Sequence, residues 1–145
     1  MGARISKLML LLMLSGCPSG PDQTASFVGT WAVTSGKSIS TCPGSQPVER
    51  DLSTAGEMLT ITGAGSQQLL VNVSPGAACP TRFSVAGDLA SADSGQSCSG
   101  AGVTSSILDS TLTLSGGMLS VSYDTSWPVN GMTCTLVLTG VATRR

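Results

Sequence analysis

Cysteine is the residue type in this sequence with the widest chemistry, because its thiolate acts both as a nucleophile and as a metal ligand. The chain contains five cysteines and no histidine. Four of the cysteines follow one another at intervals of 37, 19 and 36 residues, and they are Cys42, Cys79, Cys98 and Cys134. Zinc sites are built from closely paired cysteines, often completed by histidine. These long intervals argue against a metal site, and we expect neither a metal nor another cofactor.

The fifth cysteine, Cys17, ends a segment with the three parts of an export signal. Two basic residues give this segment a positive start, residues 8–14 form an uninterrupted apolar run, and two small residues precede the cysteine. A bilayer span needs about 20 apolar residues, so this run is too short to be a membrane helix. We therefore expect residues 1–16 to be a cleaved signal peptide.

Residues 14–17, Leu-Ser-Gly-Cys, resemble the lipobox of bacterial lipoprotein precursors. The resemblance implies that Cys17 receives a thioether-linked diacylglycerol and that its new amine is acylated, for example with palmitate. Two or three acyl chains hold a protein firmly on a membrane. Pro18 stands where an aspartate would resemble an inner-membrane retention signal, so we expect the outer membrane of a bacterial cell envelope. The alternative is an ordinary secretory signal with a coincidental cysteine.

Several catalytic chemistries are excluded by residue types and spacing. Without histidine, neither a Ser-His-Asp triad nor a Cys-His pair can form. Residues 95–99, Gly-Gln-Ser-Cys-Ser, lack the second glycine of a nucleophile elbow. The carboxylates of Glu49, Asp51 and Glu57 are the remaining candidates, for glycoside hydrolysis, but nothing in the sequence places two of them in one cleft. We therefore expect no enzymatic activity.

The composition also limits the partners. The formal net charge is −1 and only 10% of the residues are charged. A basic patch with aromatic platforms, which single-stranded nucleic acid requires, is missing. We expect no nucleic-acid partner, a membrane contact through the lipid on Cys17, and a monomer that meets either a protein partner or a small apolar ligand.

The chain after Cys17 divides into a linker and one domain. Residues 18–26 contain two prolines and show no hydrophobic periodicity, which is typical of a flexible linker. We expect residues 17–26 to be a lipidated tether. The remaining residues, 27–145, are enough for one domain with a core and too few for two.

Alternating apolar and polar residues, interrupted by glycine-containing turns, predict an all-β domain. A short extra strand is expected within residues 48–52. The eight main strands are predicted at residues 28–35, 57–63, 68–74, 80–86, 89–98, 107–115, 118–124 and 132–142.

Three two-residue turns fix the register of the strands around them. They are Gly87-Asp88, Gly116-Gly117 and Asn130-Gly131, and consecutive hairpins of this kind make an up-and-down antiparallel meander. The expected cross-strand pairs are Val85 with Ala90, Phe83 with Ala92, Leu114 with Leu119, Leu112 with Val121, Tyr123 with Leu138, Trp127 with Cys134, and Arg82 with Asp93 as an opposite-charge pair on the outer face.

Closing this meander into a barrel would remove its two unpaired edges. Residues 27–31, Phe-Val-Gly-Thr-Trp, resemble the G-x-W signature of lipocalin-like barrels. The resemblance implies that Trp31 closes the barrel floor and that an arginine of the last strand, Arg144 or Arg145, packs over it. An immunoglobulin-like β-sandwich is the alternative, in which Trp31 would be an ordinary core aromatic.

An up-and-down barrel would bring the four remaining cysteines to one rim. Since strands four and five are neighbours, as are eight and one, we expect the disulfides Cys79–Cys98 and Cys42–Cys134. Strict register places Cys79 opposite Gln96, two residues short of Cys98. We therefore expect a bulge at Gly95 that corrects this offset.

The barrel interior leaves the function open between two classes. A lining of medium-sized aliphatic residues either fills an eight-stranded barrel or surrounds one small apolar ligand. The candidate ligand-lining residues are Trp31, Phe83 and Tyr123. The favoured function is a non-catalytic, lipid-anchored envelope protein that acts as an interaction or structural module, and the alternative is a lipocalin-like carrier. The full inward-facing set is expected to be Trp31, Val33, Leu59, Ile61, Leu69, Val71, Val73, Phe83, Val85, Leu112, Leu114, Leu119, Val121, Tyr123, Leu136 and Leu138.

Overall fold

The computed structural model describes residues 22–74, 79–100 and 102–145, and most of these residues lie in strands. One helical turn precedes the first strand. The elements are α1 (Thr24–Phe27), β1 (Gly29–Thr41), β2 (Val48–Asp51), β3 (Met58–Gly65), β4 (Gln68–Ser74), β5 (Thr81–Ala86), β6 (Leu89–Ala92), β7 (Ser97–Gly100), β8 (Val103–Ile107), β9 (Thr111–Ser115), β10 (Met118–Val129) and β11 (Met132–Arg144).

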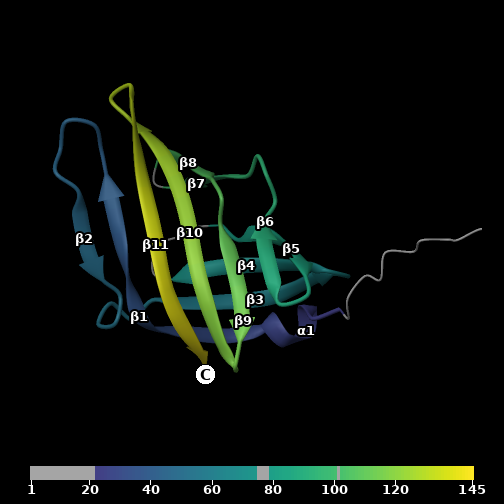
Figure 1. Ribbon diagram of the computed structural model, residues 1–145. Coiled ribbons are helices and arrows are strands. Elements are labelled where there is room, and N and C mark those ends of the chain that lie inside the picture. The colour runs from purple at the N-terminus through teal and green to yellow at the C-terminus, as the bar shows by residue number, and fades with distance from the viewer. Residues whose placement is uncertain (1–21, 75–78, 101) are drawn as a thin grey trace, which may run out of the picture.

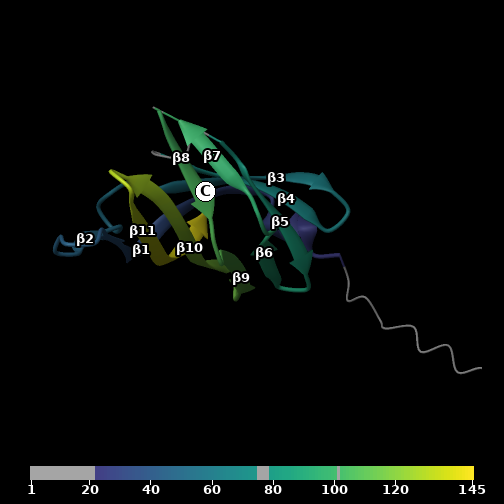
Figure 2. The same ribbon diagram turned by 90° about the horizontal axis from the view of Figure 1, so that it is seen from above.

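Eight of the strands form a closed antiparallel barrel, which confirms the predicted fold class and excludes the sandwich (Figures 1 and 2). Their order around the barrel is β11-β1-β3-β4-β5-β6-β9-β10, and pairing of β10 with β11 closes the ring. The other strands are additions to this ring. β2 pairs with the outer part of β1, and the β7–β8 hairpin continues from β10 through β8.

The predicted hairpin registers are present. Val85 faces Ala90, Leu114 faces Leu119, and the long β10–β11 ladder keeps one register from its tip to its base. Arg82 and Asp93 lie opposite each other as predicted, and the Asp93 backbone N–H donates to the Arg82 carbonyl at 3.0 Å. Their side chains form no ion pair, because the Asp93 carboxylate accepts from Ser84 Oγ at 2.6 Å. Ser84 lies two positions after Arg82 on the same strand.

The predicted strand 89–98 is interrupted, and no bulge forms at Gly95. β6 ends at Ala92, and the chain turns through Gly95 with φ 75°. The side chain of Gln96 then takes the place of the next backbone pair on β5. Its Nε2 donates to the Arg82 carbonyl at 2.7 Å, and its Oε1 accepts the Arg82 N–H at 2.7 Å. β7 is therefore not part of the barrel wall, and it pairs with β8.

The predicted strand 107–115 is also divided. β8 ends at Ile107 and β9 begins at Thr111. Between them, the Ser110 hydroxyl accepts the Asp124 backbone N–H at 2.9 Å, and the Leu108 N–H donates to the Asp124 carbonyl at 2.8 Å. A side-chain oxygen thus replaces one backbone partner of β10, and the two strands separate at this point.

β1 has two different neighbours along its length. Its first residues pair with β3 on one side, and residues 37–40 pair with β2 on that same side. The register of β1 against β11 shifts between Val33 and Ser35, and next to this shift Gly36, with φ 137°, faces Gly140 on β11. A Cβ atom on Gly36 would collide with the Thr139 carbonyl, and one on Gly140 would lie 2.6 Å from the Ser35 carbonyl oxygen. Glycine is therefore required at both positions for the strands to approach this closely.

The barrel interior is an apolar core. The inward-facing set was largely predicted. Val73 and Leu114 are half-buried and pack against the core, whereas Leu136 is half-buried outside it. Two core residues from outside the main strands were missed. Phe27 comes from α1 and Leu52 from the segment after β2, and both have 0% exposure. The residues of the core cluster are Phe27, Trp31, Val33, Leu52, Leu59, Ile61, Leu69, Val71, Phe83, Val85, Ala90, Ile107, Leu112, Leu119, Val121, Tyr123, Leu138 and Ala142.

Candidate functional site

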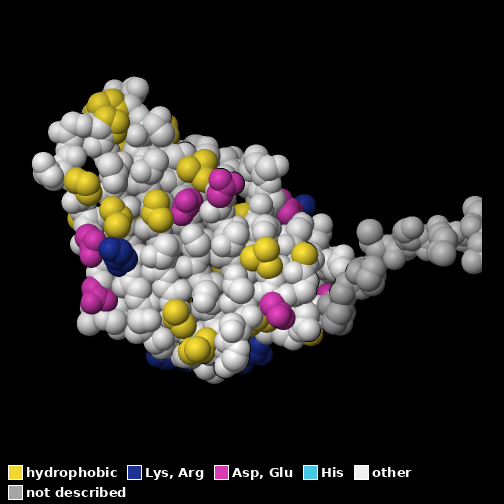
Figure 3. Space-filling view, viewed as in Figure 1, with side chains coloured by type: hydrophobic (Ala, Val, Ile, Leu, Met, Phe, Trp, Pro, Cys, Tyr) yellow, Lys and Arg dark blue, Asp and Glu magenta, His cyan; other side chains and the backbone are white. Residues whose placement is uncertain are grey.

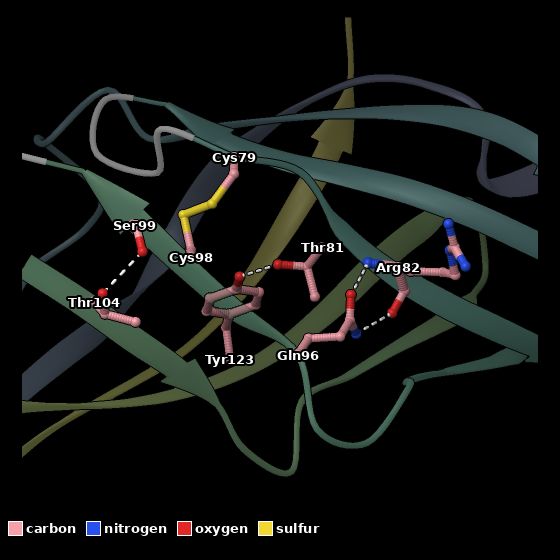
Figure 4. The surroundings of a disulfide bond; sticks show 8 residues. All are labelled: Cys79, Thr81, Arg82, Gln96, Cys98, Ser99, Thr104 and Tyr123. Carbon is pink, nitrogen blue, oxygen red and sulfur yellow. Dashed lines mark hydrogen bonds between the residues drawn. A yellow bond between two sulfur atoms is a disulfide. The ribbon is translucent and has the colours of Figure 1, made fainter.

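Two disulfides tie the end of the barrel that we call the mouth. The bonds join Cys42 to Cys134 and Cys79 to Cys98, the two pairings expected from the sequence. Cys42 follows β1 and Cys134 lies near the start of β11, while Cys79 precedes β5 and Cys98 lies in β7. In an up-and-down barrel all these positions fall at one end. The Cys79–Cys98 bond joins the β7–β8 hairpin to the barrel wall (Figure 4).

A buried hydrogen bond crosses the barrel below the mouth. It joins the Tyr123 phenol on β10 to the Thr81 hydroxyl on β5, two strands that are not neighbours in the ring (Figure 4). Both residues are buried. Burial raises the pKa of Tyr123, with the hydrogen bond from Thr81 opposing this effect. The neutral phenol is therefore the form that the interior favours, and its hydrogen bond links two strands that β6 and β9 separate in the ring.

The candidate ligand-lining residues do not border an open interior. Trp31 has 1% of its surface exposed, Phe83 has 0% and Tyr123 has 6%. A side chain beside a space large enough for water would carry accessible surface, and Trp31 and Phe83 carry almost none. These two residues are packed core, and Tyr123 is bonded to Thr81. That Trp31, Phe83 and Tyr123 line a space for an apolar ligand stays a prediction.

The opposite end, which we call the floor, is built around Trp31. The guanidinium carbon of Arg144 lies 4.7 Å from the centre of the indole ring. Trp31 Nε1 donates to the Phe27 carbonyl at 2.8 Å, and Arg144 Nη2 donates to the Ser26 carbonyl. Of the two arginines that the lipocalin-like resemblance left open, Arg144 covers the tryptophan. Arg145 contributes only its backbone N–H, which donates to the Thr30 carbonyl.

These bonds fasten α1 to the floor. Residues 24–26, which were predicted to lie in the tether, belong to α1. Before this helical turn, the Asp22 carboxylate accepts the hydroxyl and the N–H of Thr24. These bonds lower the pKa of Asp22. The helical turn therefore starts three residues before the predicted domain boundary at Phe27.

A cleft of about 420 Å³ opens on the floor beside the covered tryptophan. Two hairpin turns, one from β5–β6 and one from β9–β10, form one side of it, and α1 with the end of β11 forms the other. The backbone of the two turns is joined by the Leu114 N–H, which donates to the Asp88 carbonyl at 2.8 Å. The lining residues are Gln23, Ser26, Trp31, Asp88, Leu114, Ser115, Gly116, Gly117 and Arg144.

This cleft holds two opposite charges that do not pair. Arg144 and Asp88 both line it. Within the described ranges, ion pairs join Lys37 to Glu49 and Arg50 to Glu57, and neither residue of the cleft takes part in one. The cleft therefore offers a cation and an anion to a ligand at the same time. Its residues were not singled out from the sequence, although the turns at 87–88 and 116–117 were predicted.

The carboxylates considered for catalysis are each bonded elsewhere. Glu57 is almost fully buried and pairs with Arg50 at 3.1 Å, and burial raises its pKa while the arginine opposes this. Asp51 accepts the Ser53 N–H at 2.8 Å, which together with the serine side chain lowers its pKa. In residues 22–74, 79–100 and 102–145, no group of three or more histidine, cysteine or acidic side chains could hold a metal ion.

Asp124 is a further carboxylate with an unusual environment. Its Oδ1 is buried without a hydrogen-bond partner. Burial raises the pKa of Asp124, and the negative charge of Asp109 raises it further. The negative charges of Asp124 and Asp109 therefore lower the stability of the folded state.

Cys17 and the expected signal peptide lie outside the described residues. In the part of the chain that is described, no helix has the length and apolar character to cross a membrane. Comparison of the chain with family models, with curated proteins and with solved structures found no match.

Proposed function

We propose that this chain is a non-catalytic, lipid-anchored protein of the bacterial cell envelope, held through Cys17 with its floor toward the membrane. The anchor rests on the lipobox-like residues 14–17, and the observation that carries the orientation is the fastening of α1 to the floor. Trp31 and Arg144 hold the carbonyls of Phe27 and Ser26, so the chain enters the barrel at its floor. An anchor on Cys17 then keeps the floor next to the membrane, and the mouth with its two disulfides faces away from it.

The linker length supports a short distance between floor and membrane. Five peptide units separate Cys17 from Asp22, and an extended chain spans at most about 3.6 Å per residue. The floor therefore stays within about 20 Å of the lipid surface. Outer-membrane placement rests on Pro18, as argued from the sequence.

An interaction role is supported better than a carrier role. Core side chains such as Trp31 and Phe83 have almost no exposed surface, which supports a filled barrel. In contrast, the tip of the β10–β11 hairpin carries exposed apolar residues, Val129 at 37% and Met132 at 43% (Figures 1 and 3). This tip extends past the barrel body at the mouth end. We place the contact with a protein partner there.

The anchor is tested by detergent phase partition and by the intact mass of the processed chain. We expect the protein to enter the detergent phase, with a mature N-terminus at Cys17 and the added mass of a diacylglycerol and a fatty acid. A matched Cys17→Ser variant should lack the lipid. A processed wild-type chain without lipid mass would overturn the proposal.

The partner contact is tested with a photo-crosslinking amino acid at position 129 or 132 in living cells. A control at Thr113, on the exposed outer wall of β9, reports nonspecific contacts. We expect discrete protein adducts from the hairpin positions and none from the control. The same adducts at all three positions would contradict an interaction surface at the tip.

Occupancy of the barrel is tested by native mass spectrometry of the detergent-released protein. We expect the mass of the lipidated chain with two disulfides and no additional ligand. A reproducible extra mass that is lost on denaturation would instead support the carrier alternative.

A further inference from the structure

We propose that the cleft on the floor binds a zwitterionic phosphoester, phosphoethanolamine, as presented by a phospholipid headgroup. The inference rests on the proposed function for the source of the ligand, because only an anchored floor faces a bilayer at close range. The chemistry of the cleft itself is independent of the anchor.

Arg144 supplies the site for the phosphate. A guanidinium carries five N–H donors in a planar fork that matches phosphate oxygens. Nη2 of Arg144 donates to the Ser26 carbonyl, and the guanidinium carbon lies over the indole of Trp31, 4.7 Å from its ring centre. The remaining donors are therefore held in place before a ligand arrives, which reduces the entropy lost on binding.

Asp88 supplies the site for the ammonium group. It lies in the turn between β5 and β6, is exposed, and lines the same cleft as Arg144. The two side chains do not form an ion pair in the described chain, whose pairs are those of Lys37 and Arg50. A zwitterionic ligand in this cleft has one charged group for each of these two side chains.

The Gly116-Gly117 turn leaves room for the ligand to approach the backbone. Both glycines have positive φ angles, 57° and 77°, as a two-residue hairpin turn requires. A Cβ atom on either would meet nothing within 4 Å. This side of the cleft is therefore open toward solvent and toward a headgroup.

The cleft favours a primary ammonium over choline. Quaternary ammonium groups are recognised by exposed aromatic faces. The aromatic residue of this cleft is Trp31, which is 1% exposed and covered by Arg144. A primary ammonium, in contrast, has three N–H donors that a carboxylate such as Asp88 accepts.

The fluorescence of Trp31 provides the test. The chain has two tryptophans, so Trp127→Phe leaves Trp31 as the single reporter beneath Arg144. The full-length protein with this change, in a detergent without phosphate or amine groups, is titrated with O-phosphoethanolamine. We expect a saturable change, with phosphocholine and inorganic phosphate binding at least tenfold more weakly.

Two variants report on the two charges. Arg144→Gln and Asp88→Asn should each weaken binding at least tenfold. Arg145→Gln and Asp109→Asn are the matched controls, because neither residue lines the cleft, and they should leave the affinity unchanged. If Arg144→Gln impairs folding, the affinity of the Asp88→Asn variant still tests the proposal. An absent saturable change, equal affinity for inorganic phosphate, or an unaffected Asp88→Asn variant would overturn the proposal.

Reconstitution into vesicles shows whether the ligand is a phospholipid headgroup or a free phosphoester. The same reporter protein is placed in vesicles of phosphatidylcholine alone or with phosphatidylethanolamine. A fluorescence change that requires phosphatidylethanolamine and Asp88 supports the headgroup. A response to the soluble compound but not to these vesicles overturns the headgroup. Because the detergent titration works equally with Cys17→Ser, a failure of lipidation is recognised separately.

Discussion

Arg144 on β11 and Trp31 on β1 are direct cross-strand partners, and the guanidinium lies 4.7 Å from the indole ring centre. The same two side chains donate hydrogen bonds to the carbonyls of Ser26 and Phe27. One pair of residues thus joins the first strand, the last strand and the N-terminal turn. The floor of the barrel depends on this junction.

Replacing Arg144 with alanine should lower the free energy of unfolding by about 1–2 kcal/mol. A cation–π contact contributes about 0.5–2 kcal/mol, and a hydrogen bond about 1 kcal/mol. Arg145→Ala is the control and should cost less than about 0.5 kcal/mol, because the Arg145 backbone N–H that donates to the Thr30 carbonyl is retained by alanine. Urea denaturation measures both. Equal losses for the two variants would contradict the role of Arg144.

The Thr81–Tyr123 bond should show strong coupling between its two residues. Tyr123→Phe leaves the buried Thr81 hydroxyl unpaired, which costs about 1–3 kcal/mol, and Thr81→Val leaves the phenol unpaired at a similar cost. The double variant removes both polar groups and should cost clearly less than the sum. A double-mutant cycle from denaturation curves measures the coupling. Additive effects would mean that the bond does not form in solution.

The two disulfides should differ in their contribution to stability. They close sequence separations of 92 residues for Cys42–Cys134 and 19 residues for Cys79–Cys98. In the chain-entropy model, the longer loop contributes about 4–5 kcal/mol and the shorter one about 3 kcal/mol. Paired serine replacements, one pair at a time, give these losses in denaturation experiments. A larger loss from the Cys79–Cys98 pair would show that loop entropy is not the dominant effect.

Gly140→Ala should destabilise the barrel by at least about 2 kcal/mol. The new Cβ would lie 2.6 Å from the Ser35 carbonyl oxygen, and β1 and β11 would have to separate. Gly63→Ala is the control, because its Cβ would meet only the Val28 side chain at 4.0 Å. Thermal unfolding should show a large decrease in Tm for the first variant and little change for the second. Equal Tm values would refute the close approach of the strands.

Asp124→Asn should stabilise the protein, and more so at pH 7 than at pH 4. Burial and Asp109 raise the pKa of Asp124 in the folded state. As the pH rises, the unfolded chain releases this proton first, so the carboxyl reduces stability above its unfolded pKa of about 3.9. Asparagine has no such titration. Urea denaturation at both pH values measures the difference between variant and wild type.

Asp51 provides a control of opposite sign for this experiment. Hydrogen bonds from Ser53 lower the pKa of Asp51, so its contribution is present at neutral pH and lost as the pH falls through its folded pKa. Asp51→Asn should therefore lower the free energy of unfolding more at pH 7 than at pH 4. A pH-independent effect of both variants would contradict the assigned shifts.

The barrel could be predicted largely because its turns are short. Two-residue loops such as Gly116-Gly117 leave one register for the strands they join, and the pairs Leu114–Leu119 and Trp127–Cys134 follow from them. The same order of strands brought the cysteines to one end and led to both disulfides.

The interruptions of the strands could not be predicted from periodicity. Gln96 and Ser110 use side-chain atoms where a strand would use its backbone, and alternation of apolar residues does not distinguish these cases. The cleft was missed for another reason. Its charged residues, Asp88 and Arg144, are 56 positions apart and lie together only because turns and chain end share the floor.

The pairing of β1 with β11 has a consequence for the order of folding. The β1–β11 ladder runs from Trp31–Arg144 to Thr41–Thr135, so it joins the first and last strands of the domain. Neighbouring hairpins such as β3–β4 and β10–β11 can form as soon as both of their strands are present. The seam, in contrast, must wait until the last strand is available, and such non-local pairing slows folding. A chain threaded through a narrow channel from its N-terminus would therefore remain an open row of hairpins until the final residues emerged.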